Sequence, residues 1–340
     1  MIVSGYIIMG INNTLIINLG VYMADDRYIN VAIAQIAPIW LSQAKTIAKI
    51  LAAISEAADK GNQLVTFGEA LLPGYPFWLE PTGGAVFNSA KQKQIQSLYL
   101  QQGVNIERGD LDSICQLAGQ RNIQVILGTA ERASDRGGHS IYCSLVYISQ
   151  QGQILHVHRK LMPTYEERLS WSPGDGHGLQ THALGNFTVG ALNCWENWMP
   201  LPRAALYAQG EDLHVAIWPG GFHNTHDITR FIAKEGRSYV MSASSLMRPA
   251  DFPLDTPYLN EILLDSPEYF ANGGSCIAAP TGEWLIEPQV GDEAVYSATL
   301  DHNLVYEERQ NFDPVGHYSR PDVTQLIVNR ERQTTVKFIG

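Results

Sequence analysis

One stretch near the middle of the chain constrains its fold more than any other. Residues 187–192 form an apolar run typical of a short buried strand, and Pro200 marks the first turn of a helix, where proline is tolerated. Cys194 lies in the bend between them, beside Glu196 and Asn197. A cysteine that only packs in a core needs no polar neighbours. We therefore interpret Cys194 as a nucleophile whose thiolate the helix amide dipoles stabilise.

Strands and helices alternate along the rest of the chain. Apolar residues recur at helical spacing in several segments, and short apolar runs bounded by turn residues predict the strands between them. Predicted strands cover 30–38, 63–67, 122–130, 140–148, 153–157, 187–192, 214–218, 275–279, 284–286 and 295–300, and predicted helices cover 42–60, 88–118 with a break near Gly103, 200–209 and 228–239. No internal repeat or low-complexity linker divides the chain, so the pattern predicts one α/β domain over residues 23–325.

The two ends of the chain differ from this domain. Residues 1–22 are apolar, carry no Lys or Arg and are interrupted by asparagines. This composition favours neither a signal peptide nor a membrane span, so we interpret the segment as an extension ahead of a second start at Met23. Residues 326–340 are predicted to form a short C-terminal tail.

Charge and cysteine content exclude several kinds of protein. The formal net charge of −11 disfavours binding to nucleic acid and to anionic membrane surfaces. The four cysteines, at positions 115, 143, 194 and 276, are widely separated and form no C-x-x-C pair. We therefore expect a reducing, cytoplasmic setting and neither a disulfide framework nor a metal site.

The segment Cys194-Trp195-Glu196-Asn197 resembles the nucleophile motif of the nitrilases, a branch of the carbon–nitrogen hydrolase superfamily. Two other segments that this family requires are present in the right order, namely 67–69, which ends in Glu69, and 158–164, which contains Lys160. The resemblance extends from about residue 30 to 323 and includes the closing segment 311–322. It implies an αββα sandwich and a catalytic triad of Glu69, Lys160 and Cys194.

The resemblance also implies a second glutamate near the lysine. The family pattern P-T-x-x-E-R, counted from Pro163, falls on Glu167 and leaves Glu166 at a variable position. Three aromatic residues near the motifs, Tyr75, Trp78 and Trp195, are candidates for substrate binding, with core packing as the alternative for each.

The activity implied by the family is hydrolysis of an organic nitrile to a carboxylic acid and ammonia, with water as the second reactant and no cofactor. Glu69 is expected to act as general base, Lys160 to favour the Cys194 thiolate, and the Trp195 N–H to donate to an oxyanion. The other three cysteines are expected to be replaceable without loss of the chemical step.

Alternatives to this activity stay open at the level of sequence. An amidase or a cyanide hydratase or dihydratase would use the same triad, and an inactive member could serve as a binding or assembly protein. A metal pair of His156 and His158, which share a strand face, has no third ligand nearby. No G-x-S-x-G motif is present. The family implies a homo-oligomer built from dimers, which in this branch extends to spirals or filaments.

Overall fold

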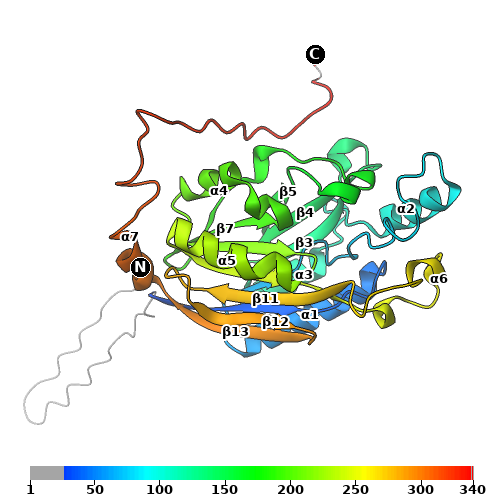
Figure 1. Ribbon diagram of the computed structural model, residues 1–340, viewed down its shortest axis with the longest axis horizontal. Coiled ribbons are helices and arrows are strands. Elements are labelled where there is room, and N and C mark those ends of the chain that lie inside the picture. Colours follow the sequence, from blue (N-terminus) through cyan, green and yellow to red (C-terminus); the bar gives the residue numbers. More distant parts are fainter. Residues whose placement is uncertain (1–26, 338, 340) are drawn as a thin grey trace, which may run out of the picture.

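The computed structural model describes residues 27–337 and 339, which fold into two β-sheets packed face to face with helices on both outer surfaces (Figure 1). The predicted extension, residues 1–22, lies outside the described residues. In the described part of the chain, no helix combines the length and apolar character that a membrane span needs.

The first sheet has the strand order β13-β1-β2-β3-β4-β5. Its central strands β1, β2 and β3 run parallel, and the outer strands are antiparallel to their neighbours. Ala34 of β1 pairs with Phe67 at the end of β2, so the carboxyl ends of these strands meet at one edge. The strands are β1 (Tyr28–Gln35), β2 (Leu64–Phe67), β3 (Gln124–Arg132), β4 (Ile141–Ile148), β5 (Ile154–Arg159) and β13 (Ala294–Asp301).

The second sheet has the order β10-β11-β9-β8-β7-β6, and β12 pairs with β11. Its central strands β7, β8 and β9 are again parallel, and Asn193 at the end of β7 pairs with Ile217 of β8. The strands are β6 (His182–Leu184), β7 (Phe187–Asn193), β8 (Leu213–Trp218), β9 (Tyr239–Ser244), β10 (Leu246–Met247), β11 (Ala271–Ala278) and β12 (Trp284–Val290).

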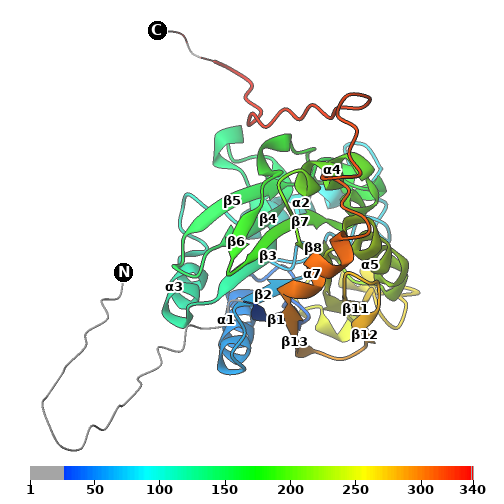
Figure 2. The same ribbon diagram turned by 90° about the vertical axis from the view of Figure 1, so that its left-hand side faces the viewer.

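Helices cover the outer faces of both sheets (Figure 2). Helices α1 (Gln43–Asp59) and α3 (Asp112–Arg121) pack on the first sheet through an apolar layer, and α4 (Pro200–Tyr207) and α5 (Phe222–Gly236) pack on the second. Between the sheets lies a third apolar layer to which both contribute, for example Ile33, Leu145, Val215 and Met241. The layers form the αββα sandwich that the resemblance implied. The remaining helices are α2 (Ala90–Gln102), α6 (Leu259–Ile262) and α7 (His302–Arg309).

Most predicted elements are present with ends shifted by a few residues, but one predicted helix has the wrong bounds and several elements were not predicted. The helix predicted for 228–239 is α5, which starts at Phe222 and ends before Arg237, a residue in the left-handed region with φ 48°. Tyr239 therefore begins β9, a strand absent from the prediction. Every residue of β9 is buried, so it lacks the alternation that marks a half-exposed strand. The other missed elements are the short strands β6 and β10 and helices α6 and α7.

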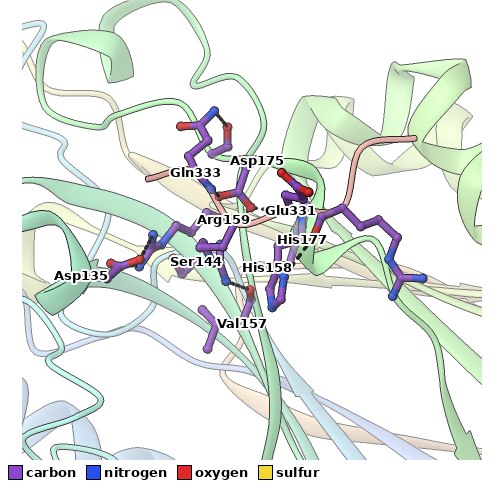
Figure 3. A network of polar contacts seen from close by, with 12 residues as sticks. Asp135, Ser144, Val157, His158, Arg159, Asp175, His177, Glu331 and Gln333 are labelled. Atoms are coloured by element: carbon purple, nitrogen blue, oxygen red, sulfur yellow. Dashed lines mark hydrogen bonds and ion pairs between the residues drawn. The ribbon is translucent and has the colours of Figure 1, made fainter. Parts of the chain in front are cut away.

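The predicted C-terminal tail contains no helix or strand over 326–337 but is held against the body. Asp175, whose side chain is buried, accepts hydrogen bonds from the Arg332 guanidinium at 3.0 Å and from the Gln333 N–H at 2.9 Å. Arg332 also donates to the carbonyl of Val157 in β5 at 2.9 Å. Figure 3 shows Asp175 and Gln333 next to each other beside this edge strand. The tail thus covers part of the β5 edge.

Candidate active site

Cys194 lies between the end of β7 and the helix α4. It has a φ of 47°, in the left-handed region, and begins a short 3₁₀ turn, Cys194–Trp198, that precedes α4. Pro200 is the first residue of α4, as predicted. The expected bend is therefore confirmed, but a full 3₁₀ turn separates the thiol from the helix. The amides nearest to Cys194 belong to that turn, and a backbone hydrogen bond from Trp195 lowers the pKa of the thiol.

A buried carboxylate fixes the start of this turn. Glu196 accepts hydrogen bonds from the N–H of Asn193 at 2.9 Å and from the N–H of Leu161 at 2.5 Å. Its Oε2 also lies 3.0 Å from Nε2 of His158. Burial alone would raise the pKa of Glu196, but His158 and the two amides lower it. Glu196 therefore joins the cysteine turn to the segment that carries the lysine, and the spacing Asn193-x-x-Glu196 of a capping box could have revealed this role.

A second polar chain supports the turn from the other side. Asn197 donates through Nδ2 to the carbonyl of Cys194 at 2.8 Å, and its Oδ1 lies 2.8 Å from Nε2 of His214. Nδ1 of His214 lies 2.8 Å from Glu211. All of these side chains are buried. The side-chain oxygen and nitrogen of Asn197 and both ring nitrogens of His214 have partners in this chain, so the Cys194 carbonyl is held from this side.

Glu69 follows β2 at the carboxyl edge of the first sheet. Its N–H donates to the carbonyl of Trp218 in the second sheet at 2.9 Å, and this contact brings the two sheets together. Gly68 makes the approach possible, because a Cβ at this position would lie 2.7 Å from the Ser245 nitrogen and 2.9 Å from the Trp218 oxygen. The glutamate is therefore placed by contacts between the sheets as well as by its own strand.

Lys160 lies between two carboxylates. Its Nζ is 2.8 Å from Glu69 Oε1 and 2.7 Å from Glu167 Oε2, and all three side chains are buried. Glu167 also accepts the N–H of Thr164 at 2.6 Å and the hydroxyl of Tyr75 at 2.8 Å. Of the two adjacent acids, Glu167 rather than Glu166 contacts Lys160, as the family pattern implied.

Two carboxylate oxygens and the sulfur of Cys194 lie close together. One carboxylate oxygen of Glu69, one of Glu167 and the sulfur of Cys194 all lie within 4.8 Å of one another. Such a set could hold a metal ion, but the Lys160 ammonium already contacts both carboxylates at hydrogen-bond distance. A fixed cation at that place is suited to stabilising negative charge during a reaction.

The electrostatics favour a neutral thiol and a basic carboxylate. Burial raises the pKa of Cys194 well above its usual value, and the carboxylate of Glu69 adds to this more than Lys160 opposes it. Burial also raises the pKa of Glu69 to about 7, against the opposing effect of Lys160. Lys160 does favour the thiolate, as expected, because its charge lowers the pKa of Cys194, but desolvation and Glu69 raise that pKa by more. The thiol therefore needs a base beside it.

Sequence reasoning missed one residue of this site. The Sγ of Cys143 in β4 donates to Glu69 Oε1 at 3.3 Å, and its backbone carbonyl accepts the N–H of Lys160 at 2.8 Å. The expectation that Cys143 is replaceable without loss of the chemical step stays a prediction, and these two contacts make Cys143 the cysteine on which to test it. No local motif marks this residue, since it meets Glu69 only through the packing of β4 against its neighbours.

The three aromatic candidates occupy different environments. Tyr75 contacts Glu167 and lines a cavity beside the site. Trp195 is 52% exposed and its ring lies 6.3 Å from that of Trp198. Trp78 is fully buried between Trp40 and Tyr99. Trp78 belongs to a buried hydrophobic cluster and does not line that cavity, which favours core packing, the alternative considered for it.

Sequence comparison finds one family and a group of similar enzymes. Residues 30–310 match the family described as Carbon-nitrogen hydrolase. "Nitrilase 2" of Arabidopsis thaliana is 35% identical over 322 residues, which cover 94% of this chain and 94% of that protein. A "Bifunctional nitrilase/nitrile hydratase NIT4A" of Nicotiana tabacum is 33% identical and covers 91% of this chain and 88% of that protein.

Solved structures with the same fold share less sequence. A carbon-nitrogen hydrolase from Helicobacter pylori G27 has a TM-score of 0.65 at 19% identity, covering 87% of this chain and 96% of that chain. An amidase from Nesterenkonia sp. has a TM-score of 0.59 at 17% identity, covering 83% and 94%. At this level of identity the similarity supports the fold alone.

Proposed function

The chain belongs to the carbon–nitrogen hydrolase family, in its nitrilase branch, and we propose that it hydrolyses an organic nitrile to the carboxylic acid and ammonia. The observation that carries the proposal is the position of Lys160 Nζ, 2.8 Å from Glu69 and 2.7 Å from Glu167, with the sulfur of Cys194 within 4.8 Å of both carboxylates. This arrangement places a nucleophile, a base and a fixed positive charge around one point.

The first step proposed is attack by Cys194 on the nitrile carbon. Glu69, with a pKa of about 7, takes the thiol proton as the sulfur forms its bond to carbon. The nitrile nitrogen takes up an electron pair of the carbon–nitrogen triple bond and receives from Glu69 the proton that came from the thiol, which gives a thioimidate and leaves Glu69 ionised. In this proposal the Lys160 ammonium and the Trp195 N–H stabilise the negative charge that develops.

Two water molecules complete the reaction. Glu69 removes a proton from the first, whose oxygen adds to the thioimidate carbon, and the nitrogen leaves as ammonia after protonation. The product of that step is a thioester with Cys194. A second water attacks in the same way, the carbon–sulfur bond breaks, the sulfur recovers its proton, and the carboxylic acid is released.

Glu167 and Tyr75 have supporting roles in this proposal. Glu167 holds Lys160 through the 2.7 Å ion pair, and Tyr75 holds Glu167 through its hydroxyl. Burial alone would lower the pKa of Lys160, but the carboxylates of Glu69 and Glu167 help to raise it well above its usual value. The lysine therefore stays charged through the catalytic cycle and is suited to binding charge rather than to donating its proton early.

A nitrile is favoured over an amide as substrate by the sequence relatives. Relatives that share 32–35% identity with this chain across most of its length are named nitrilases or bifunctional nitrilase/nitrile hydratases. The amidases share 16–17% identity and support only the fold. Amide hydrolysis is therefore the alternative activity that the experiment has to distinguish from nitrile hydrolysis.

The test is release of ammonia from matched nitriles and amides, with the acid and amide products measured separately. Wild type is expected to turn over at least one nitrile faster than the matching amide. Cys194→Ser is expected to keep the fold and lose activity by about three orders of magnitude or more, since a hydroxyl is a far poorer nucleophile. Cys115→Ser, which changes a half-buried thiol on α3, is the control and should retain activity. Ammonia release by Cys194→Ser above a few per cent of wild type would contradict the proposal.

Assembly and setting form part of the proposal. We propose a homo-oligomer built from dimers, which the exposed apolar side chains on and around α4 and α5 support, namely Trp195, Trp198, Met199, Leu201 and Phe231. Light scattering of the purified protein measures the size of the assembly and whether it extends to spirals or filaments. A reducing, cytoplasmic setting is supported by the four cysteines, all of which are free thiols.

A further inference from the structure

A cavity of about 580 Å³ opens beside the candidate active site. Tyr75 lines this cavity and also donates its hydroxyl hydrogen to Glu167 at 2.8 Å. Pro219 and Gly220 line another part of it and directly follow Trp218, whose carbonyl accepts the N–H of Glu69. The cavity therefore lies next to the site, near Glu167 through Tyr75 and near Glu69 through Trp218. The body of a substrate would lie in this cavity.

Aromatic rings form one wall of this cavity. The ring of Phe77 lies 4.9 Å from that of Tyr75 and 5.6 Å from that of Phe270. Ile262 adds an aliphatic surface. Such a wall suits the apolar part of an organic nitrile, because removing that surface from water stabilises the complex.

The charges around the cavity all have the same sign. Glu80, Glu166 and Asp265 line it, and the lining contains neither Lys nor Arg; its one basic side chain is His223. Within the part of the chain that the structure describes, none of the three carboxylates forms an ion pair. Their field is therefore not cancelled by a fixed partner and acts on whatever occupies the cavity.

We propose that this site prefers nitriles with a cationic group at the end distant from the nitrile, and that it disfavours nitriles with a carboxylate there. The inference rests on the proposed nitrilase function and adds the substrate class. A distal ammonium group is attracted by the three carboxylates, and a distal carboxylate is repelled by them. A neutral group of the same size falls between the two, because it gains the aromatic contacts but not the charge interaction.

The charge pattern also concerns the product. Hydrolysis converts a neutral nitrile group into a carboxylate inside the site. An acidic cavity repels this new negative charge and so favours departure of the acid. The same three carboxylates thus select the substrate and promote release of the product.

The experiment compares two series of nitriles with matched shapes. One series consists of para-substituted benzonitriles that carry an aminomethyl, ethyl or carboxymethyl group, in which a methylene insulates the charge from the nitrile. The other consists of alkanenitriles of equal length that end in an ammonium, methyl or carboxylate group. Values of kcat/KM are measured at neutral pH and low salt. The ammonium compound of the better series is expected to exceed the carboxylate compound by about tenfold or more, and added salt should reduce the ratio.

Variants connect the preference to these residues. The triple variant Glu80→Gln, Glu166→Gln, Asp265→Asn is expected to lower the ratio of ammonium to carboxylate kcat/KM about tenfold, because the ammonium compound loses its attraction and the carboxylate compound loses its repulsion. Glu268→Gln is the matched control, since it removes one exposed charge three residues after Asp265 in the sequence that does not line the cavity. It should leave the ratio unchanged.

The outcomes separate this inference from the proposed function. Turnover of the neutral nitriles with the carboxylate compounds equal to or better than the ammonium compounds would overturn the inference alone. A ratio that is unaltered in the triple variant, while that variant still turns over neutral nitriles, would do the same. If wild type turned over none of the six compounds but hydrolysed the matching amides, the proposed function would fall and this inference with it.

Discussion

Glu166 and Glu167 are neighbours in the chain with different surroundings. Glu167 is buried and contacts Lys160 and Tyr75, whereas Glu166 lines the adjoining cavity. We expect Glu167→Gln to lower kcat by two or more orders of magnitude, about 3 kcal/mol, because the lysine loses one of its two anionic partners. Glu166→Gln should change kcat by less than about tenfold on a neutral nitrile. Steady-state kinetics on one good substrate measures both.

The two variants serve as controls for each other. Each removes one carboxylate from the same loop, so a general effect of the loop would appear in both. Circular dichroism checks that both fold. Loss of activity in Glu166→Gln rather than in Glu167→Gln would show that the wrong acid has been assigned to the lysine.

The raised pKa of Glu69 predicts how activity depends on pH. A general base acts only in its ionised form, and burial raises the pKa of Glu69 to about 7. Below that value the carboxylate is protonated, so kcat/KM should fall about tenfold for each unit of decreasing pH. The profile of kcat/KM for a neutral nitrile is the measurement. An acidic limb at the usual pKa of a glutamate would contradict the burial argument.

Replacing Cys143 tests the predicted pH dependence in a second way. Its thiol donates to Glu69 at 3.3 Å, and this hydrogen bond lowers the pKa of the carboxylate. Cys143→Ala should therefore move the acidic limb to higher pH, whereas Cys115→Ser, remote from the carboxylate, should leave it in place. A purely structural role for Cys143 would lower activity without moving the limb.

At the level of the secondary-structure elements, the close approach of the two sheets at Gly68 determines where Glu69 lies. A Cβ on Gly68 would lie 2.7 Å from Ser245 N and 2.9 Å from Trp218 O, and backbone atoms cannot move aside easily. We expect Gly68→Ala to destabilise the fold by about 1–3 kcal/mol. It should also reduce kcat by about tenfold or more, because Glu69 is displaced with the strand end. Chemical denaturation and kinetics measure the two effects.

Gly61 provides the comparison for Gly68. A Cβ there meets nothing within 4 Å, although its φ of +77° is unfavourable for other residues. Gly61→Ala should cost about 1 kcal/mol of stability and leave kcat unchanged. If both variants behaved alike, backbone conformation rather than contact between the sheets would explain the loss.

Across the whole molecule, the C-terminal tail closes one edge of the first sheet. Arg332 pairs with the buried Asp175 and donates to the carbonyl of Val157. We expect Arg332→Gln to lower stability by about 1–3 kcal/mol, because Asp175 loses its charged partner. For a chain of this size the melting temperature should drop by a few degrees, at about 2–4 °C per kcal/mol.

Arg330 is the matched control for this prediction. Its backbone carbonyl lies 3.2 Å from Nδ1 of His177, and replacing its side chain leaves that contact intact. Arg330→Gln should therefore keep the melting temperature of wild type. A tail that detaches in solution would make both variants equal to wild type, which thermal unfolding would reveal.

The sequence by itself predicted one α/β domain with Cys194 as nucleophile, and its resemblance to a known family implied the sandwich and the roles of Glu69, Lys160 and Glu167. An apolar run, a bend and a proline-started helix are local signals, because a few adjacent residues decide them. The same holds for Glu69 and Lys160, each at the end of a strand, and for the P-T-x-x-E-R spacing that falls on Glu167. Local patterns of this kind depend on neighbouring residues, so they can be recognised without knowledge of the packing.

Only the tertiary structure decided which groups of the site carry a proton and which residues surround the site. Desolvation and the facing Glu69 keep Cys194 neutral, and both effects depend on groups far away in sequence. Cys143 meets Glu69 through the packing of separate strands, and Trp78 is buried by residues brought over it. The acidic cavity combines side chains from four distant segments, including Glu80, Glu166 and Asp265. Charge and burial depend on distance in space, which the order of residues along a chain does not specify.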